Sequence, residues 1–285
     1  MKPPPFEYKD PRSLDETLAV LAENGEDGKV LAGGQSLVPL LNFRLAQPSV
    51  IIDVNRVEEL SYLRRGDGKL RIGALCRQAR LEQSPVAREG WGLLGDALKL
   101  VAHPQIRNRG TVGGSAAHAD PAAELPVALA CLDARFKARS SRGDRVLEAR
   151  DFFVTHLTTA LEPDELLVEV EVPPLPEGTG HAFEEYSRRH GDFALGGAAV
   201  LYTTNGDGSC TDARIALLGA ADTPLRATEA EAELKGKQLT EDLAAEAARI
   251  ATRDIDPTGD IHGSGSYRKR LIEAMVRRAL LKAAA

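Results

Sequence analysis

The chain has 285 residues, of which 43% are hydrophobic and 27% are charged, values that are typical of a soluble globular protein. Its formal net charge of −6 at pH 7 argues against nucleic acid or an anionic membrane surface as the main partner. A chain of this length exceeds the usual ~100–150 residues of a single domain, so we expect more than one.

The N-terminal segment, MKPPPFEYKDPRS, lacks the apolar core of a signal peptide, and no run approaches the ~18 apolar residues of a membrane span. We therefore expect a cytoplasmic protein without a membrane span. Ser13 and Glu16 form the pattern of a capping box, which predicts the start of a helix. Leu14, Leu18 and Leu21 are spaced to lie on one face of that helix.

A glycine-rich turn follows the first predicted strand. Lys29–Leu31 reads as a short buried strand, and Ala32–Ser36 (AGGQS) comes directly after it. A helix over Val38–Leu45 and a strand over Val50–Val54 complete a βαβ pattern. Paired glycines permit positive φ and close approach of a ligand, and successive exposed N–H groups form a nest that suits a phosphate.

The periodicity changes to two after Tyr62, which is typical of strands. Gly66-Asp67-Gly68 predicts a hairpin turn, and the apolar residues from Trp91 to Val101 predict a helix that packs on the sheet. The further elements expected in this part are strands at Leu63–Arg65 and Leu70–Ile72, a helix over Glu124–Leu132, and strands near Phe136, Val146 and Phe152.

A second glycine-rich turn, Thr111–Ser115 (TVGGS), lies within the stretch RNRGTVGGSAAHADPAAELP. Two such turns in one chain suggest that they hold one diphosphate from opposite sides. Each turn alone is also compatible with an ordinary tight turn. Neither matches G-x-G-x-x-G at the start of a helix or G-x-x-x-x-G-K-[ST], so the common nucleotide fingerprints are absent.

The alternating pattern of Leu166–Val172 predicts a strand, and Pro173–Gly178 (PPLPEG) is typical of a linker, so we place the domain boundary there. The elements expected beyond it are strands around His181–Tyr186, Ala198–Tyr202 and Arg214–Leu218, a turn at Asn205–Gly208, and helices near Leu239–Arg253 and Tyr267–Leu281. They predict a small domain of antiparallel sheet plus helices.

The three cysteines, Cys76, Cys131 and Cys210, are far apart in the chain, so we expect small buried hydrophobes rather than disulfides or a zinc site. An iron–sulfur cluster usually takes four thiolates, so any such cluster would lie on a partner chain. No nucleophile–base pair or acid–base dyad stands out. We therefore expect neither a catalytic residue nor a metal ligand here.

Four motifs resemble the FAD-binding medium subunit of the molybdenum hydroxylases, the xanthine dehydrogenase and carbon monoxide dehydrogenase family. They are AGGQSL at 32–37, TVGGSAAHADPAAELP at 111–126, RRHGDFA at 188–194 and SGSYR at 264–268. The resemblance implies an α+β chain with a two-subdomain FAD-binding fold of the vanillyl-alcohol oxidase (PCMH) type over 1–176, its subdomains covering about 1–57 and 58–176. It also implies a CO dehydrogenase flavoprotein C-terminal-type domain over 177–285.

The same resemblance implies noncovalent FAD whose pyrophosphate is held by the two glycine loops. The residues that it assigns to the cofactor are Ala32, Gly33, Gly34, Gln35, Ser36, Leu37, Val101, Thr111, Val112, Gly113, Gly114, Ser115, His118, Asp120, Glu124, Leu167, Asp192 and Phe193. Ser115 stands where the family commonly has Asn. Glu184-Glu185 lies where relatives often carry a lysine, and Arg188 and Arg189 could compensate for the missing charge.

Several of these residues also have a purely structural interpretation. Asp120 and Glu124 could accept hydrogen bonds from ribityl or ribose hydroxyls, and Glu124 could equally be a first-turn acid of a helix. His118 could face the flavin or be an ordinary loop residue. Phe193 would shield the flavin beside Asp192, or would be buried behind a Gly-Asp turn. Val101 and Leu167 would lie beside the adenine or belong to the core.

The function implied by the resemblance is electron transfer. Substrate would be hydroxylated on a large molybdopterin subunit, and electrons would pass through a small iron–sulfur subunit to this FAD and on to an external acceptor. The assembly would be a dimer of heterotrimers. Two alternatives are a self-sufficient FAD-dependent oxidoreductase of the same fold and a cofactor-free scaffold subunit. The substrate, the final acceptor and the use of NAD are left open.

Overall fold

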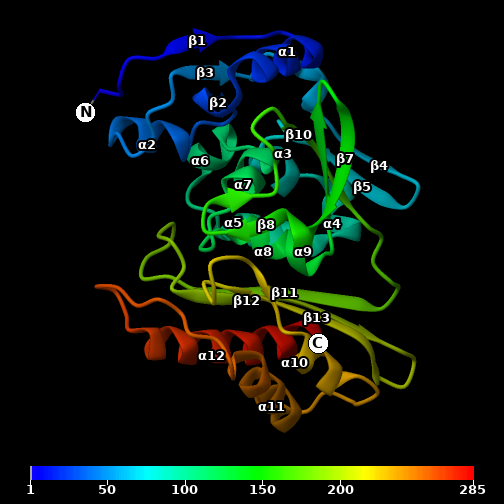
Figure 1. Cartoon of the computed structure of the whole chain (residues 1–285). Coiled ribbons are helices and arrows are strands. Elements are labelled where there is room, and N and C mark those ends of the chain that lie inside the picture. Colours follow the sequence, from blue (N-terminus) through cyan, green and yellow to red (C-terminus); the bar gives the residue numbers. More distant parts are fainter. Residues whose placement is uncertain (1) are drawn as a thin grey trace.

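A small parallel sheet forms the first layer of the computed structural model, which describes residues 2–285 (Figure 1). Its strands are β1 (Glu7–Lys9), β2 (Gly28–Leu31) and β3 (Val50–Asp53), in the order β1-β3-β2. Helices α1 (Leu14–Asn24) and α2 (Leu37–Asn42) connect them, with 3-10 turns at Gly25–Asp27 and Glu58–Leu60. This arrangement confirms the predicted βαβ unit.

The N-terminus of α1 is capped by the serine that the sequence pattern predicted. The Ser13 hydroxyl accepts a hydrogen bond from the N–H of Glu16 at 3.2 Å, and the three predicted leucines of the helix face are buried. The Glu16 carboxylate accepts from the N–H of Arg12 at 2.8 Å, one residue before the cap. Only the serine half of the predicted capping box is therefore formed.

The second layer is an antiparallel sheet beside a group of short helices. Its strands are β4 (Leu63–Gly66), β5 (Lys69–Gly73), β6 (Arg135–Ser140), β7 (Gly143–Glu148) and β10 (Leu166–Val172), in the order β4-β5-β10-β6-β7. Asp67 and Gly68 both have positive φ, of 53° and 75°, at the predicted hairpin turn. This is the backbone of a primed two-residue turn, which suits the twist of the strands.

The helices of the second layer are α3 (Gln78–Glu82), α4 (Pro85–Gly90), α5 (Gly92–Leu100), α6 (Pro104–Arg109), α7 (Val112–His118), α8 (Glu124–Cys131) and α9 (Ala149–Phe152). A two-stranded ribbon of β8 (Phe153–Thr155) and β9 (Thr158–Thr159) follows. The strand expected near Phe152 is β8, which begins at the next residue; Phe152 itself ends α9 and stacks on Phe136 with ring centroids 3.9 Å apart. Trp91 is buried as expected, and its indole N–H donates to the carbonyl of Pro173 at 2.7 Å.

The third layer is a sheet with helices on its outer face. Strands β11 (Thr179–Tyr186), β12 (Gly196–Thr204), β13 (Cys210–Leu218) and β14 (Leu225–Arg226) are antiparallel in this order. Helices α10 (Thr228–Leu234), α11 (Glu241–Thr252) and α12 (Gly265–Ala283) follow. Strand β14 and helix α10 were not predicted, whereas the expected sheet and the last two helices are present.

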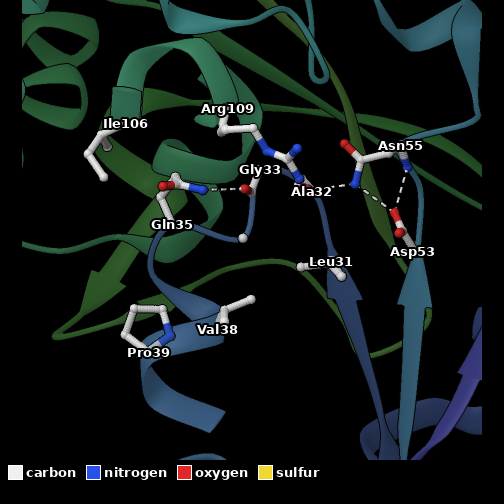
Figure 2. A pocket seen from close by; sticks show the side chains of 11 residues that line it. Leu31, Ala32, Gly33, Gln35, Val38, Pro39, Asp53, Asn55, Ile106 and Arg109 are labelled. Atoms are coloured by element: carbon white, nitrogen blue, oxygen red, sulfur yellow. Dashed lines mark hydrogen bonds between the residues drawn. The ribbon is translucent and has the colours of Figure 1, made fainter. Parts of the chain in front are cut away.

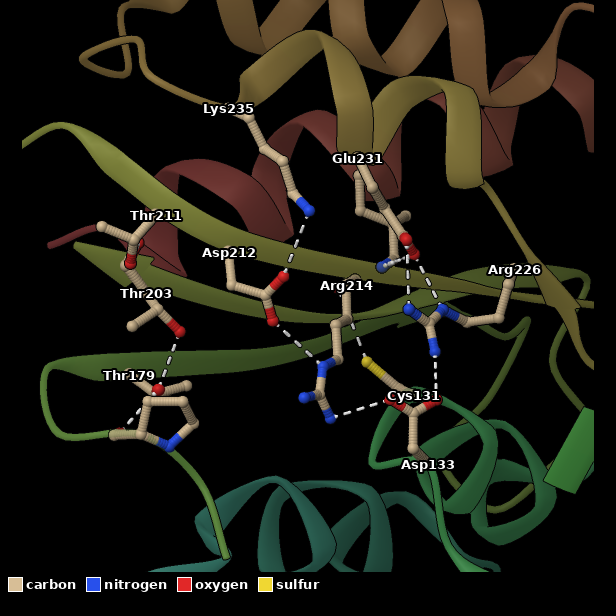
Figure 3. A network of polar contacts seen from close by, with 12 residues as sticks. Cys131, Asp133, Thr179, Thr203, Thr211, Asp212, Arg214, Arg226, Glu231 and Lys235 are labelled. Atoms are coloured by element: carbon tan, nitrogen blue, oxygen red, sulfur yellow. Dashed lines mark hydrogen bonds and ion pairs between the residues drawn. The ribbon is translucent and has the colours of Figure 1, made fainter. Parts of the chain in front are cut away.

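The second and third layers share one apolar core. Helix α8 packs on α5 at one side and on β12 and β13 at the other, and all of its residues are buried. Arg226 spans the junction: it forms ion pairs with Asp133 at 2.6 Å and with the buried Glu231 at 2.7 Å (Figure 3). Asp133 also pairs with Arg214 at 3.0 Å. Among residues 2–285, no helix is long and apolar enough to cross a bilayer.

Candidate functional site

A cavity of about 790 Å³ lies where the three layers meet. Its walls come from both glycine-rich segments, the start of α8, the segment around β9, and the loop between β11 and β12. Every residue that the sequence assigned to the cofactor lines this cavity except Val112. Val112 is fully buried, and its N–H donates to the carbonyl of Cys76 at 3.0 Å.

The first glycine segment carries free backbone donors. It leaves the end of β2 and enters α2, with Gly34 at a φ of 74°. Among the described residues, the N–H groups of Gly33 to Ser36 donate to no other atom of the chain. The side-chain amide of Gln35 donates to the carbonyl of Gly33 at 2.8 Å, which restrains the turn. Such a row of unpaired N–H groups suits a phosphate, as predicted.

The second glycine segment is built differently from the prediction. It is not a free turn: it starts α7, and the hydroxyl of Thr111 accepts from the N–H of Gly114 at 3.0 Å. The N–H of Gly113 donates to the carbonyl of Ala74 at 2.9 Å, and that of Ser115 to the carbonyl of Thr111. The prediction of a second backbone nest was therefore wrong. The hydroxyl of Ser115, which has no partner in the described chain, lines the cavity instead.

The first glycine segment packs closely against Arg109 and Gly110, the two residues directly before the second segment. A Cβ atom added to Gly33 would lie 2.5 Å from the carbonyl oxygen of Arg109 and 2.8 Å from the Cα of Gly110. A Cβ atom added to Gly114 would lie 3.7 Å from the Cβ of Ala32. At Gly33 only glycine lets the two backbones approach so closely, whereas the separation at Gly114 is an ordinary van der Waals contact. The segments, far apart in the sequence, thus form one continuous wall of the cavity.

Titratable residues gather where α7 ends and α8 begins. One Asp120 oxygen is used locally, since it accepts from the N–H of Ala122 at 2.9 Å. Burial lowers the pKa of His118, so this imidazole is neutral at pH 7. Glu124 is buried in the first turn of α8, and burial, aided by Glu185, raises its pKa to about 8. At neutral pH its carboxyl is therefore protonated and can donate as well as accept a hydrogen bond.

Two residues in or beside this site were not assigned to the cofactor from the sequence, although the pair Glu184-Glu185 was noted there. Glu185 on β11 is the charge that acts on Glu124, and burial raises its own pKa to about 7. Its Oε2 atom has no hydrogen-bond partner in the described chain. Gln78 lines the cavity and is buried with an unpartnered Oε1 atom. Neither belongs to a motif, and only the packing of distant elements places them here.

The loop between β11 and β12 brings Asp192 and Phe193 to the mouth of the cavity. The alternative of a buried phenylalanine was wrong, because Phe193 is 71% exposed. Gly191 has a φ of 90° and packs against the imidazole of His103, where a side chain would not fit. This contact holds the loop of the third layer onto the second. Arg188 lies 3.9 Å from Asp192 and balances its charge.

The residues present fit a dinucleotide. Free N–H groups and a hydroxyl suit phosphates, carboxyl and amide groups suit sugar hydroxyls, and the apolar Val101 and Leu167 suit an aromatic base. In the part of the chain that the structure describes, no group of three or more His, Cys, Asp or Glu could hold a metal ion.

Two family models cover the chain. The FAD binding domain in molybdopterin dehydrogenase matches residues 4–175, and the CO dehydrogenase flavoprotein C-terminal domain matches residues 181–283. The alpha subunit of the 6-hydroxypseudooxynicotine dehydrogenase complex of Paenarthrobacter nicotinovorans is 48% identical, with 99% of this chain and 96% of the relative covered. The carbon monoxide dehydrogenase medium chain of Hydrogenophaga pseudoflava is 39% identical, with 98% and 97% covered.

Solved structures agree with these matches. A carbon monoxide dehydrogenase structure from Hydrogenophaga pseudoflava superposes with a TM-score of 0.96 at 41% identity, with 99% of this chain and 98% of that chain covered. A chain of quinoline 2-oxidoreductase from Pseudomonas putida 86 gives a TM-score of 0.95 at 43% identity, with 100% and 98% covered.

Proposed function

Because the chain belongs to the family of FAD-binding medium subunits of molybdenum hydroxylases, we propose that the cavity of about 790 Å³ is its FAD site. The chain is an oxidoreductase subunit that carries FAD in electron transfer. It works in a multi-subunit complex, with the molybdopterin and the iron–sulfur clusters on other subunits. This supports the subunit interpretation over a self-sufficient oxidoreductase or a scaffold without cofactor.

One observation carries this proposal above all: two glycine segments from different layers face the same cavity, and the first packs against the residues directly before the second. Free N–H groups of Gly33 to Ser36 would bind the diphosphate oxygens, and the hydroxyl of Ser115 would add a donor from the second segment. FAD supplies the redox chemistry when it is bound, while the protein binds, orients and insulates it. We assign the insulating role to Phe193 at the cavity mouth.

Glu124 would take part as a neutral acid. A protonated carboxyl donates one hydrogen bond and still accepts others, so it suits a sugar hydroxyl in either sense. Its place in the first turn of α8 keeps the carboxyl at the cavity wall. The structural and the cofactor-binding roles weighed from the sequence are thus compatible with each other.

The test uses the complete assembly. Co-expression with the large and small subunits and purification through this chain should give one FAD per chain, measured by flavin absorbance. Denaturation should release the flavin, because the bond is noncovalent. A complex that contains all three subunits but no flavin, and that takes none up from solution, would contradict the proposal.

We also propose that the assembly is a dimer of heterotrimers, which a solution mass of two copies of each subunit would support and a mass of one copy would exclude. The proposed division into domains at residues 176 and 177 is supported by the irregular segment 173–178 and by family matches on either side of it. A cytoplasmic location stays a prediction from the sequence. The substrate would be selected on another subunit in this scheme.

A further inference from the structure

The cavity that we assign to FAD is acidic, although the diphosphate of this ligand is an anion. Among residues 2–285, six carboxyl residues line it, whereas Lys29 is the only lysine or arginine that does so. The six are Glu26, Asp120, Glu124, Glu162, Glu165 and Asp192. Arg109 lies close to the first glycine segment but lines an adjoining cavity of about 500 Å³, where Asp53 offsets its charge (Figure 2). Because like charges in one site repel, the protonation of these acids affects the binding of a diphosphate.

One of these acids has neither an arginine nor water to compensate its charge. Glu165 pairs with Arg145 at 2.6 Å, and Asp192 lies 3.9 Å from Arg188. Of the other four, Glu124 alone is buried, with 8% of its surface exposed. In the described chain, no cation and no donor of another residue acts on its carboxyl. The ionised form of Glu124 would therefore be an uncompensated charge at the cavity wall.

Glu185 lies on the face of β11 that packs on the second layer. Successive side chains of a strand point to opposite faces of the sheet. Glu184 points outward, where Lys282 of α12 pairs with it at 2.9 Å, and Phe183 belongs to the core shared with the second layer. Glu185 therefore points inward, as Phe183 does, and its buried Oε2 atom has no hydrogen-bond partner in the described chain.

The two carboxyls share their charge unequally. Burial raises the pKa of Glu185 to about 7, and burial together with Glu185 raises the pKa of Glu124 to about 8. Glu185 therefore ionises first as pH rises, and its charge opposes the ionisation of Glu124. The first negative charge of the pair thus lies on Glu185, which does not line the cavity, while Glu124 stays neutral at the cavity wall.

The other charged groups around the pair do not replace either carboxyl. Asp120 acts on Glu124 in the same direction as Glu185, and burial keeps the pKa of His118 low, so this imidazole is neutral above pH 7. Strand β12 carries no charged residue. The groups on the remaining neighbouring elements lie in ion pairs: Lys99 with Asp96 on α5, Arg150 with Asp151 on α9, Arg214 with Asp212 on β13, Arg226 of β14 with Glu231, and Arg188 with Asp192 after β11.

We propose that Glu185 is a positioning residue that keeps the carboxyl of Glu124 protonated beside the cofactor, and that this pair makes FAD binding depend on pH. The inference rests on the proposed function. A protonated Glu124 donates a hydrogen bond and adds no charge, whereas the ionised form loses that hydrogen bond and repels the diphosphate. FAD binding should therefore weaken as pH rises through the range in which Glu124 ionises, and binding in that range should take up a proton.

The experiment titrates the flavin-depleted complex with FAD between pH 6 and 9 and follows flavin fluorescence. The wild-type dissociation constant should rise about tenfold between pH 7 and 9, because binding is linked to one proton whose pKa is about 8. Glu124→Gln cannot ionise and should abolish this rise. Glu184→Gln is the matched control on the outer face of the same strand, and it should keep the rise.

Glu185→Gln distinguishes a positioning role from a merely structural one. Without the charge of Glu185, Glu124 ionises at lower pH, so the rise should begin about half a pH unit or more below that of wild type. At pH 8 this variant should bind FAD more weakly than wild type, although it has lost a negative charge. Thermal unfolding at pH 6 checks that the variants fold.

Proton uptake on the wild-type complex needs no variant. With an indicator dye in weak buffer at pH 8.5, FAD binding should take up about half a proton or more per FAD. A wild-type dissociation constant that is constant from pH 7 to 9 overturns the proposal, as does a rise that persists in Glu124→Gln. A Glu185→Gln rise that begins at or above the wild-type pH overturns the role of Glu185. A wild-type complex that binds no FAD at any pH would instead contradict the proposed function.

Discussion

Gly33→Ala tests whether the close packing of the first glycine segment on the end of α6, just before the second segment, builds the cofactor site. The new Cβ atom would meet the carbonyl oxygen of Arg109 at 2.5 Å, whereas ordinary contacts begin at 3.4 Å. The obstacle is backbone that cannot rotate away, so the first segment must retreat by about 0.9 Å. This shift moves the free N–H groups of the segment away from the proposed diphosphate.

The magnitude follows from the donors that are displaced. A hydrogen bond to a charged group contributes about 1.5–3 kcal/mol, and a retreat of this size weakens one or two of them. We therefore expect FAD binding to lose about 2–5 kcal/mol, which corresponds to a dissociation constant raised roughly 30-fold to 5,000-fold. The overlap should also cost about 1–3 kcal/mol of folding stability.

The assay is titration of the flavin-depleted complex with FAD, followed by quenching of flavin fluorescence. Gly95→Ala is the matched control, because it adds a methyl group to the middle of α5 where nothing lies within 4 Å. It should bind FAD as wild type does and gain up to about 1 kcal/mol of stability. Wild-type FAD affinity in a folded Gly33→Ala complex would refute the role given to the contact.

Three further predictions concern other parts of the structure. Since Glu124 has its pKa raised to about 8 in the folded chain, the folded state holds a proton that the unfolded state loses near pH 4.5. The unfolding free energy should therefore fall, by up to about 4 kcal/mol, as pH rises from 5 to 8, and Glu124→Gln should remove most of this slope in urea titrations. Glu231→Gln leaves the partly buried Arg226 with Asp133 as its only remaining carboxylate and should cost about 1–3 kcal/mol by the same method, whereas Glu229→Gln, which breaks an exposed pair with Arg253, should matter little. Phe193→Ala should change stability by less than about 0.5 kcal/mol but make bound flavin more accessible to iodide quenching, and unchanged quenching would speak against its shielding role.

Local patterns predicted the elements that are regular in sequence. The leucine face of α1, the hairpin at Asp67 and Gly68, and the alternation of β10 were all readable, because each depends on spacing or on a backbone preference within a few residues. Helix α10 was missed because it is short and begins directly after a two-residue strand. Its packing on β13 and α11, which the sequence pattern does not reveal, defines it as a separate element.

The candidate site was predictable in its membership but not in its chemistry. The motifs identified residues that line one cavity. However, the N–H groups of the second glycine segment donate hydrogen bonds to Ala74, Cys76 and Thr111, so they are not free for a phosphate. Ala74 and Cys76 come from a distant part of the chain and leave no trace in the motif itself. In the same way, the protonated state of Glu124 depends on burial beneath another layer and on Glu185, which the sequence does not place beside it.

Helix α8 makes the two halves of the molecule mutually dependent. Because the helix has no solvent-facing side, a fragment that ended at the linker would present the apolar residues of its second face to water. Such a fragment would be prone to self-association, although two family models divide the chain there. Insertions and fusions should accordingly be tolerated at the chain ends and in exposed turns such as 205–208 rather than at the boundary between the two matches.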